Sequence, residues 1–208
     1  MTRSPAINCG STRSGDRAAA PPDCNPVSMP DEAALVHAAQ DDRAAFGVLY
    51  HRYVDRVYAY VRARTTTEED AADLTQHVFV QALHALPQYR VQTVPFAAWL
   101  FRIARNAAID AHRRRRITVA WDFIPEALQP IGDRDPEDSA LRRDAIEQLR
   151  TLLRALNQET RELLALRFAA GLTMAEIAAV IGTSEAATKK RLARALHGLK
   201  EQYHDAPR

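Results

Sequence analysis

Two short stretches of the chain carry the side chains best suited to bind a polyanion. The first, Trp99–Arg116, has six arginines and one aspartate, a local net charge of +5. The second, Ser184–Tyr203, has five lysines and arginines against two glutamates, or +3. Between them, Asp122–Asp138 has six acids and one arginine, or −5. The whole chain carries a net charge of only +2, so the cations are concentrated in these two stretches. This uneven distribution of charge predicts two separate contacts with a nucleic acid.

Residue patterns for enzymatic chemistry are absent from the sequence. The seven histidines and two cysteines form no H-x-x-x-H or C-x-x-C spacing, and there is no G-x-S-x-G motif or phosphate-binding glycine loop. Cys9 and Cys24 both lie near the N-terminus, so a disulfide framework is not expected to hold the fold. We therefore expect no enzymatic activity, no bound metal and no cofactor.

The composition favours an all-α fold. Only 7 of 208 residues are glycine and 7% are aromatic, whereas alanine, leucine, arginine and glutamate abound. Residues 1–30 lack periodicity and predict a disordered tail, with Met29 as an alternative translation start. No apolar run approaches the roughly 20 residues of a membrane span, and no signal peptide is seen, which predicts a cytoplasmic protein without membrane insertion.

Apolar periodicity predicts two small helical domains joined by a flexible acidic linker. The first domain, residues 31–116, has expected helices at 31–40, 43–64, 67–86 and 96–116, with a loop at 87–95. The second domain, residues 139–208, has expected helices at 139–156, 158–169, 174–181 and 184–203. Residues 117–138 contain three prolines among the acids, which is typical of a linker.

The last two predicted helices form a helix-turn-helix. Thr173 with Glu176 predicts a capping box, Gly182 a turn, and Ser184 a second N-cap. The face expected to pack inward consists of Thr188, Leu192, Ala195, Leu196, Leu199 and Tyr203. The opposite face combines small residues with cations, as a helix that reads DNA requires. A plain helical hairpin with a solvated basic face is the alternative interpretation.

The helix expected at 96–116 also has two faces. A core stripe consists of Phe96, Trp99, Leu100, Ile103 and Ala107. The other face consists of Arg102, Arg105, Asn106, Ile109 and Arg113, with Asp110 at the seam. Arginines in this arrangement neutralise phosphates, and an asparagine can read a base edge.

The helix expected at 67–86 places an apolar residue among polar ones. Leu74, Val78, Phe79 and Ala82 cover one side. Val80 lies on the other side, among acids and amides, and this mixture indicates a protein-docking surface.

These motifs resemble the extracytoplasmic-function (ECF) group of the sigma-70 family of RNA polymerase sigma factors. The run Asp70–Phe79 (DAADLTQHVF) resembles region 2.2, and Phe96–Arg116 resembles regions 2.3 and 2.4. Residues Leu156–Leu199, including LLALRF and the helix-turn-helix, resemble region 4. The resemblance covers nearly all of residues 33–203 and implies a sigma factor that brings core RNA polymerase to promoter DNA and opens it.

The resemblance also implies a role for individual positions. Those expected to meet core polymerase, at its β′ clamp, are Asp70, Asp73, Leu74, Gln76, Phe79 and Val80. Those expected to bind the melted −10 element are Gln88, Arg90, Arg102, Arg105, Asn106, Asp110, Arg113 and Arg114. Those expected to bind the −35 element are Ser184, Ala186, Ala187, Lys190, Arg191 and Arg194. The β flap and an anti-sigma factor are further implied partners.

The sequence departs from the family pattern at several positions. His77 replaces a usual acid, Thr188 a usual apolar residue, and Ala187 a usual threonine. Asn157 replaces a common proline and is expected to cap a helix. A stand-alone helix-turn-helix regulator remains the alternative function, although it leaves the patterns at 66–116 unexplained. Promoter sequence, inducing signal and the anti-sigma factor's identity are not encoded in any motif.

Overall fold

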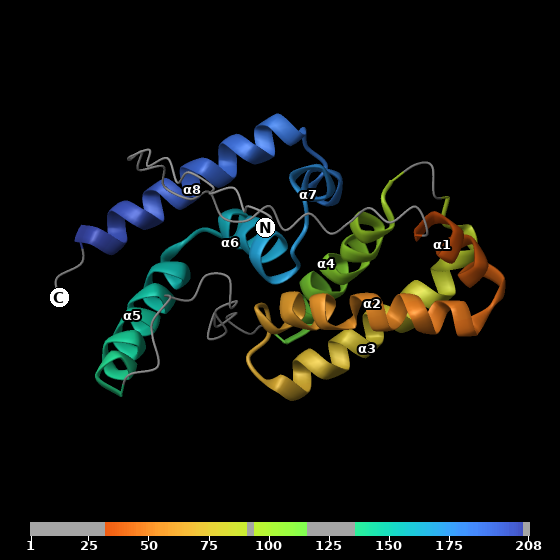
Figure 1. Ribbon diagram of the computed structural model, residues 1–208, viewed down its shortest axis with the longest axis horizontal. Helices are drawn as coiled ribbons and strands as arrows, with labels where there is room; N and C mark the ends of the chain where they lie inside the picture. Colours follow the sequence, from red (N-terminus) through yellow and green to blue (C-terminus); the bar gives the residue numbers. More distant parts are fainter. Residues whose placement is uncertain (1–31, 91–93, 116–135, 206–208) are drawn as a thin grey trace, which may run out of the picture.

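A computed structural model of the protein describes residues 32–90, 94–115 and 136–205 (Figure 1). Every regular element within these ranges is helical. The predicted tail and residues 116–135 of the predicted linker lie outside the described residues, as do the side chains of residues 114, 115, 136–142 and 205.

The N-terminal half contains four α-helices near the predicted positions. They are α1 (Glu32–Asp41), α2 (Arg43–Arg62), α3 (Glu68–Ala85) and α4 (Phe96–Arg115), with a 3₁₀ turn η1 (Leu86–Gln88) after α3. Local hydrogen bonds explain where two helices begin. The carboxylate of Asp42 accepts from the Ala44 amide at 2.8 Å, and the hydroxyl of Thr67 accepts from the Asp70 amide at 3.1 Å. The predicted Thr67 cap is thus present in the structure.

The C-terminal half also follows the predicted order. Its elements are α5 (Pro136–Ala155), α6 (Gln158–Leu164), α7 (Met174–Ile181) and α8 (Glu185–Asp205). Asn157 caps α6 as expected, accepting from the Thr160 amide at 2.8 Å. α5 starts at Pro136, inside the stretch assigned to the linker, because proline suits the first turn of a helix.

The single helix expected at 158–169 changes geometry halfway. After Leu164 the chain forms a π-helical turn, η3 (Ala165–Ala169). At its end the Ala170 amide donates to the Ala165 carbonyl at 3.0 Å, a bond across five residues. Gly171 follows with a φ of 64°, a left-handed conformation that favours glycine and ends the helical segment.

The two halves of the chain lie against each other (Figure 1). α4 packs on α2 and α3 on one side and on α7 on another, and α2 also packs on η3. One cluster of buried side chains therefore runs from Tyr60 and Phe101 in the N-terminal half to Leu172 and Ile177 in the C-terminal half. Contact between the halves was not predicted from the sequence.

Candidate nucleic-acid interface

Aromatic packing fixes the rotation of α4, the helix richest in arginine. Phe96 meets the ring of Tyr53 edge-on, with centroids 5.4 Å apart, and Phe101 meets Tyr60 at 5.6 Å. Such edge-to-face pairs add about 0.5–1.5 kcal/mol to the gain from burial. With these rings turned inward, the opposite side of α4 is presented to solvent.

An exposed polar row results on α4. Arg102, Asn106, Asp110 and Arg113 follow one another at spacings of four, four and three residues, and all four are exposed. These spacings place them along one side of the helix. Four of the residues predicted to bind the −10 element are thus brought together. Arg114 also belongs to α4, but its side chain lies outside the described residues.

Arg105 departs from this row. Its side chain is 35% exposed, and Nε lies 3.7 Å from Oε1 of Glu162 on α6. This Nε is buried and has no hydrogen-bond partner. The structure therefore directs one predicted DNA ligand toward the C-terminal half of the protein.

The prediction that α4 has one buried stripe and one open face was wrong in part. Ala104 and Ala108, which lie outside the predicted core stripe, are both buried, and Ile109 is half-buried. α7 also packs on α4, and small residues such as these alanines allow neighbouring helices to approach closely. The row of Arg102, Asn106, Asp110 and Arg113 remains open.

The chain before α4 is anchored by Tyr89. Its ring is 7% exposed and lies 4.8 Å from that of Trp99, while its hydroxyl donates to the Val94 carbonyl at 2.6 Å. The Gln40 amide donates to the Tyr89 carbonyl at 2.7 Å. Gln88 and Arg90 flank this anchor and are exposed, and both precede the N-terminal end of α4. Two predicted −10 residues are thereby held at one end of the arginine helix.

The buried tyrosines make the fold sensitive to alkali. Burial, reinforced by the Glu32 carboxylate, raises the pKa of Tyr89 to about 12, and burial likewise raises the pKa of Tyr60. In the unfolded chain a tyrosine ionises near pH 10. The stabilisation from neutral Tyr89 is therefore complete below pH 10 and is lost as the pH rises toward 12.

Tyr89→Phe should consequently reduce the alkaline loss of stability. Between pH 8 and pH 11 we expect wild type to lose about 1 kcal/mol more unfolding free energy than the variant, because only wild type has this ionisable group. Urea unfolding at both pH values measures the difference. Equal losses in the two proteins would contradict the shifted pKa.

The second candidate interface is the helix-turn-helix, α7 and α8. Thr173 and Glu176 form the predicted capping box, with the Glu176 amide 3.2 Å from Thr173 Oγ1 and the Thr173 amide 2.8 Å from Glu176 Oε2. Gly182 adopts a φ of 73°, and the Thr183 amide donates to the Ala178 carbonyl at 3.0 Å. Ser184 caps α8 by accepting from the Ala187 amide at 3.2 Å. All the predicted turn and cap residues act as expected.

The buried Thr188 is accommodated without an unpaired hydroxyl. Its Oγ1 donates to the Ser184 carbonyl at 3.0 Å, one turn earlier on the same helix. Leu192 and Leu199 are also buried, as expected for the inward face. Leu196 was expected on that face but is exposed, because α5, α6 and α7 cover other parts of α8.

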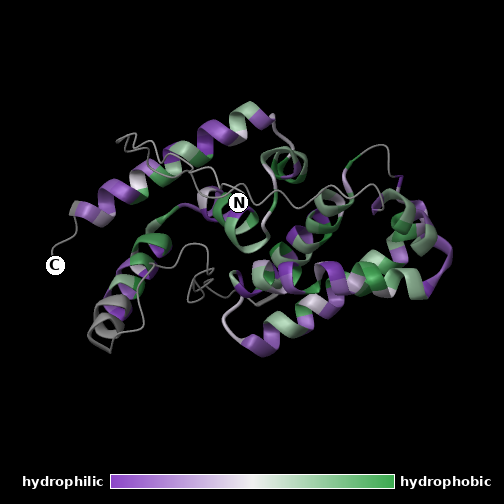
Figure 2. Ribbon diagram, in the orientation of Figure 1, coloured by the Kyte–Doolittle hydropathy of each residue, from purple (hydrophilic) through white to green (hydrophobic). Residues whose placement is uncertain are grey.

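The outer face of α8 is cationic. Hydrophilic residues cover much of this helix (Figure 2). Ser184, Ala186, Lys190, Arg191 and Arg194 are exposed, and Ala187 is half-buried. Arg191 and Arg194 also line a hollow of about 380 Å³ between α8 and the start of α6. The predicted −35 residues thus form a continuous surface over the first three turns of α8.

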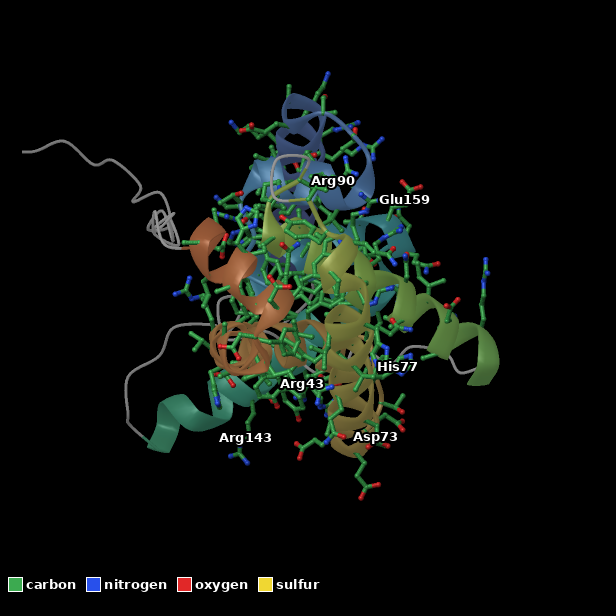
Figure 3. All side chains as sticks on the ribbon, turned by 90° about the vertical axis from the view of Figure 1, so that its right-hand side faces the viewer. Arg43, Asp73, His77, Arg90, Arg143 and Glu159 are labelled. Carbon is green, nitrogen blue, oxygen red and sulfur yellow. The ribbon has the colours of Figure 1, made fainter. Side chains whose placement is uncertain are left out.

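The candidate docking surface lies on α3. Asp73, Gln76, His77 and Val80 are exposed, and Val80 is 53% exposed despite being apolar. Asp73 and His77 project from the same side of α3 (Figure 3). Asp70 and Leu74 are half-buried.

Phe79, which was placed in the same docking set, is only 5% exposed. Its ring packs 4.7 Å from that of Tyr50. In this structure it supports the docking helix from within, and its side chain is not part of the surface.

Within residues 32–90, 94–115 and 136–205, no group of three or more His, Cys, Asp or Glu side chains is arranged to hold a metal ion. Over the same residues, no helix has the length and hydropathy needed to cross a membrane.

Comparison with known proteins identifies the class to which this arrangement belongs. Residues 49–117 match the family model of sigma-70 region 2, and residues 146–197 match that of sigma-70 region 4. The chain belongs to the ECF sigma factors of the sigma-70 family, which are non-enzymatic, DNA-binding factors of transcription initiation. The prediction of an all-α protein with two sigma domains is confirmed.

Particular relatives agree with this assignment. The ECF RNA polymerase sigma factor BldN of Streptomyces coelicolor is 37% identical over 84% of this chain, which spans 66% of that protein. The ECF RNA polymerase sigma factor SigD of Mycobacterium tuberculosis is 33% identical, with 82% of each chain covered.

A solved structure shares the fold of most of the chain. In the structure of CnrH in complex with the cytosolic domain of CnrY, CnrH is 29% identical to this chain. The TM-score is 0.61, with 85% of this chain and 99% of that chain covered.

Proposed function

We propose that this protein binds core RNA polymerase, recognises promoter −10 and −35 elements, and supports melting of the DNA for transcription initiation. The observation that carries the proposal is the presence, in one ECF sigma chain, of the exposed row on α4 and the capped, cationic helix α8. Two DNA-binding surfaces separated along the chain suit a promoter with two elements. The protein acts without a catalytic activity of its own, in the cytoplasm where polymerase and chromosome meet.

The −10 contact is assigned to α4 and the chain before it. Arg102 and Arg113 neutralise backbone phosphates, and Asn106 between them hydrogen-bonds the edge of an unstacked base. Gln88 and Arg90 extend the same surface toward the N-terminal end of α4. Pulling a base from the duplex costs a few kcal/mol, which these contacts offset.

The −35 contact is assigned to the start of α8. Ala186 and Ala187 are small enough to let the helix approach the base edges in the major groove, while Lys190, Arg191 and Arg194 hold the phosphates. Ser184 caps the helix and positions its N-terminus toward the DNA backbone.

Polymerase docking is assigned to α3 and the C-terminal half. Asp73, Gln76 and Val80 would meet the β′ clamp, with Asp70 and Leu74 at the edge of this contact, and the C-terminal domain would meet the β flap. An exposed apolar residue surrounded by acids and amides suits a polar interface with a small hydrophobic centre. An anti-sigma factor is a further proposed partner, supported by the family membership.

Reconstitution with sigma-free core polymerase tests this function. The chain and core polymerase should co-elute in size exclusion, and the mixture should produce discrete new transcripts from genomic fragments. Mapping the transcript starts then reveals the −10 and −35 sequences. No complex, together with tight sequence-specific DNA binding by the free chain as a dimer, would instead establish a stand-alone helix-turn-helix regulator.

Lys190→Ala tests the −35 surface through its salt dependence. Loss of one phosphate contact should lower the slope of log K against log salt by about 1 for promoter binding by the reconstituted holoenzyme. Lys200→Ala is the matched control, because it removes the same charge from an exposed position near the far end of α8. An unchanged slope for Lys190→Ala would remove this lysine from the contact.

A further inference from the structure

A buried carboxylate joins the two halves of the protein. Glu162 of α6 is 6% exposed, and its partners come from the N-terminal half. The Tyr60 hydroxyl donates to Glu162 Oε1 at 2.7 Å, the Arg64 guanidinium forms an ion pair with Oε2, and Arg105 approaches Oε1 at 3.7 Å. A tyrosine of α2, an arginine after α2 and an arginine of α4 thus converge on one anionic group.

Arg56 makes a second polar contact between the halves. Its Nε donates to the Ala170 carbonyl at 2.7 Å, and Nη2 donates to the Gly171 carbonyl at 3.3 Å. The guanidinium is itself held over the rings of Tyr53 and Phe101, at 5.2 and 5.8 Å from their centroids. Its position is therefore set by the N-terminal core, while its donors cap the end of η3.

The chemistry of the Glu162 site is that of an oxyanion receptor. Guanidinium and phenol groups that bind a carboxylate can bind a phosphate by the same charge-assisted hydrogen bonds. Separating the halves exposes both arginines to water, so the receptor survives opening and can take another anion. Its fit to Glu162 is incomplete, because Arg105 Nε is buried without a hydrogen-bond partner. Burial costs both charges their hydration, and rehydration of the separated groups offsets much of the attraction lost when the pair opens.

We propose that Glu162 closes the free protein by occupying a phosphate-binding site made of Tyr60, Arg64 and Arg105, and that the DNA backbone takes this site when the halves separate. This inference rests on the proposed function in that Arg105 belongs to the −10 helix. Closure and DNA binding then compete for the same arginines. The free chain is held in a state with weakened affinity for DNA by one of its own side chains.

Small-angle X-ray scattering and oligonucleotide binding test the proposal on the full chain, without polymerase. Glu162→Gln keeps the shape of the side chain and removes its charge. We expect a larger radius of gyration and about tenfold tighter binding of a fluorescent single-stranded oligonucleotide, which corresponds to about 1.4 kcal/mol. Glu159→Gln is the matched control, since it makes the same charge change at an exposed position on the same helix. It should leave the radius of gyration unchanged and alter affinity far less.

Arg64→Ala separates closure from DNA binding. It removes the partner of Glu162 and should enlarge the radius of gyration as Glu162→Gln does, but without tightening oligonucleotide binding, because the receptor has lost an arginine. Circular dichroism confirms that each variant retains its helices.

Three outcomes would overturn the proposal. A Glu162→Gln protein as compact as wild type would refute the closure. An open Glu162→Gln protein with unchanged affinity would refute the phosphate site, as would an Arg64→Ala protein that binds DNA as tightly as Glu162→Gln. If the chain failed to support transcription, the proposed function would be refuted instead. The radius of gyration and the oligonucleotide affinity are measured without polymerase and do not depend on that result.

Discussion

Phe101→Ala should lower the free energy of unfolding by about 3–5 kcal/mol. Phe101 is fully buried, meets Tyr60 edge-on at 5.6 Å and lies beneath the Arg56 guanidinium. Its removal leaves a cavity where α2 and α4 meet. Because domains of this size have a total stability of only about 5–15 kcal/mol, the variant should be partly unfolded at growth temperature.

Urea unfolding followed by circular dichroism measures this loss. Val80→Ala is the control, because Val80 is 53% exposed and its truncation should change stability by less than about 0.5 kcal/mol. A loss below about 1 kcal/mol for Phe101→Ala would show that the neighbouring helices collapse into the space, and that the α2–α4 contact does not depend on this ring.

Asn106→Ala should reduce promoter opening by about 5- to 150-fold, the equivalent of about 1–3 kcal/mol for one lost base contact. Asn106 is exposed on α4 between Arg102 and Asp110. Binding to core polymerase should be unchanged. Permanganate reactivity of the melted −10 region measures opening, and size exclusion measures polymerase binding, on a promoter identified by reconstitution.

Val80→Arg should give the opposite pattern. A long cation at the centre of the α3 surface should weaken polymerase binding, while the exposed row on α4 is untouched.

Arg105→Ala should also impair promoter opening, but it removes a partner of Glu162 as well, so Asn106→Ala is easier to interpret. Equal loss of both activities in Asn106→Ala would contradict the separate roles assigned to α3 and α4.

Most helices and caps could be predicted from the sequence because their causes are local. Thr67, Asn157, Thr173 and Ser184 each accept a bond from the amide three residues along, so their spacing in the sequence is enough. The role of Gly182 could also be predicted locally, since a left-handed turn favours glycine whatever surrounds it. The exposed row on α4 also follows directly from helical periodicity.

The rest depends on contacts between distant parts of the chain. Glu162 sits beside Leu163 and Leu164 in an ordinary helical pattern, and nothing nearby indicates that Tyr60 and Arg64 meet it. The approach of Arg105 to Glu162 requires α6, and no periodicity specifies that α7 packs on α4. Helical periodicity places Phe79 on the apolar side of α3, in agreement with its burial against Tyr50. Its contact with core polymerase was inferred from the family resemblance alone and remains a prediction.

The hydrogen bonds from Arg56 to the end of η3 join residues that leave the ribosome at different times. Arg56 precedes Ala170 by 114 positions. At translation speeds of about 5–20 residues per second, that separation takes about 6–23 s. Throughout this interval the nascent N-terminal half lacks η3 and α7, and the surfaces of α2 and α4 on which they pack are open. A protein that binds there therefore does not compete with the C-terminal half until synthesis is nearly complete.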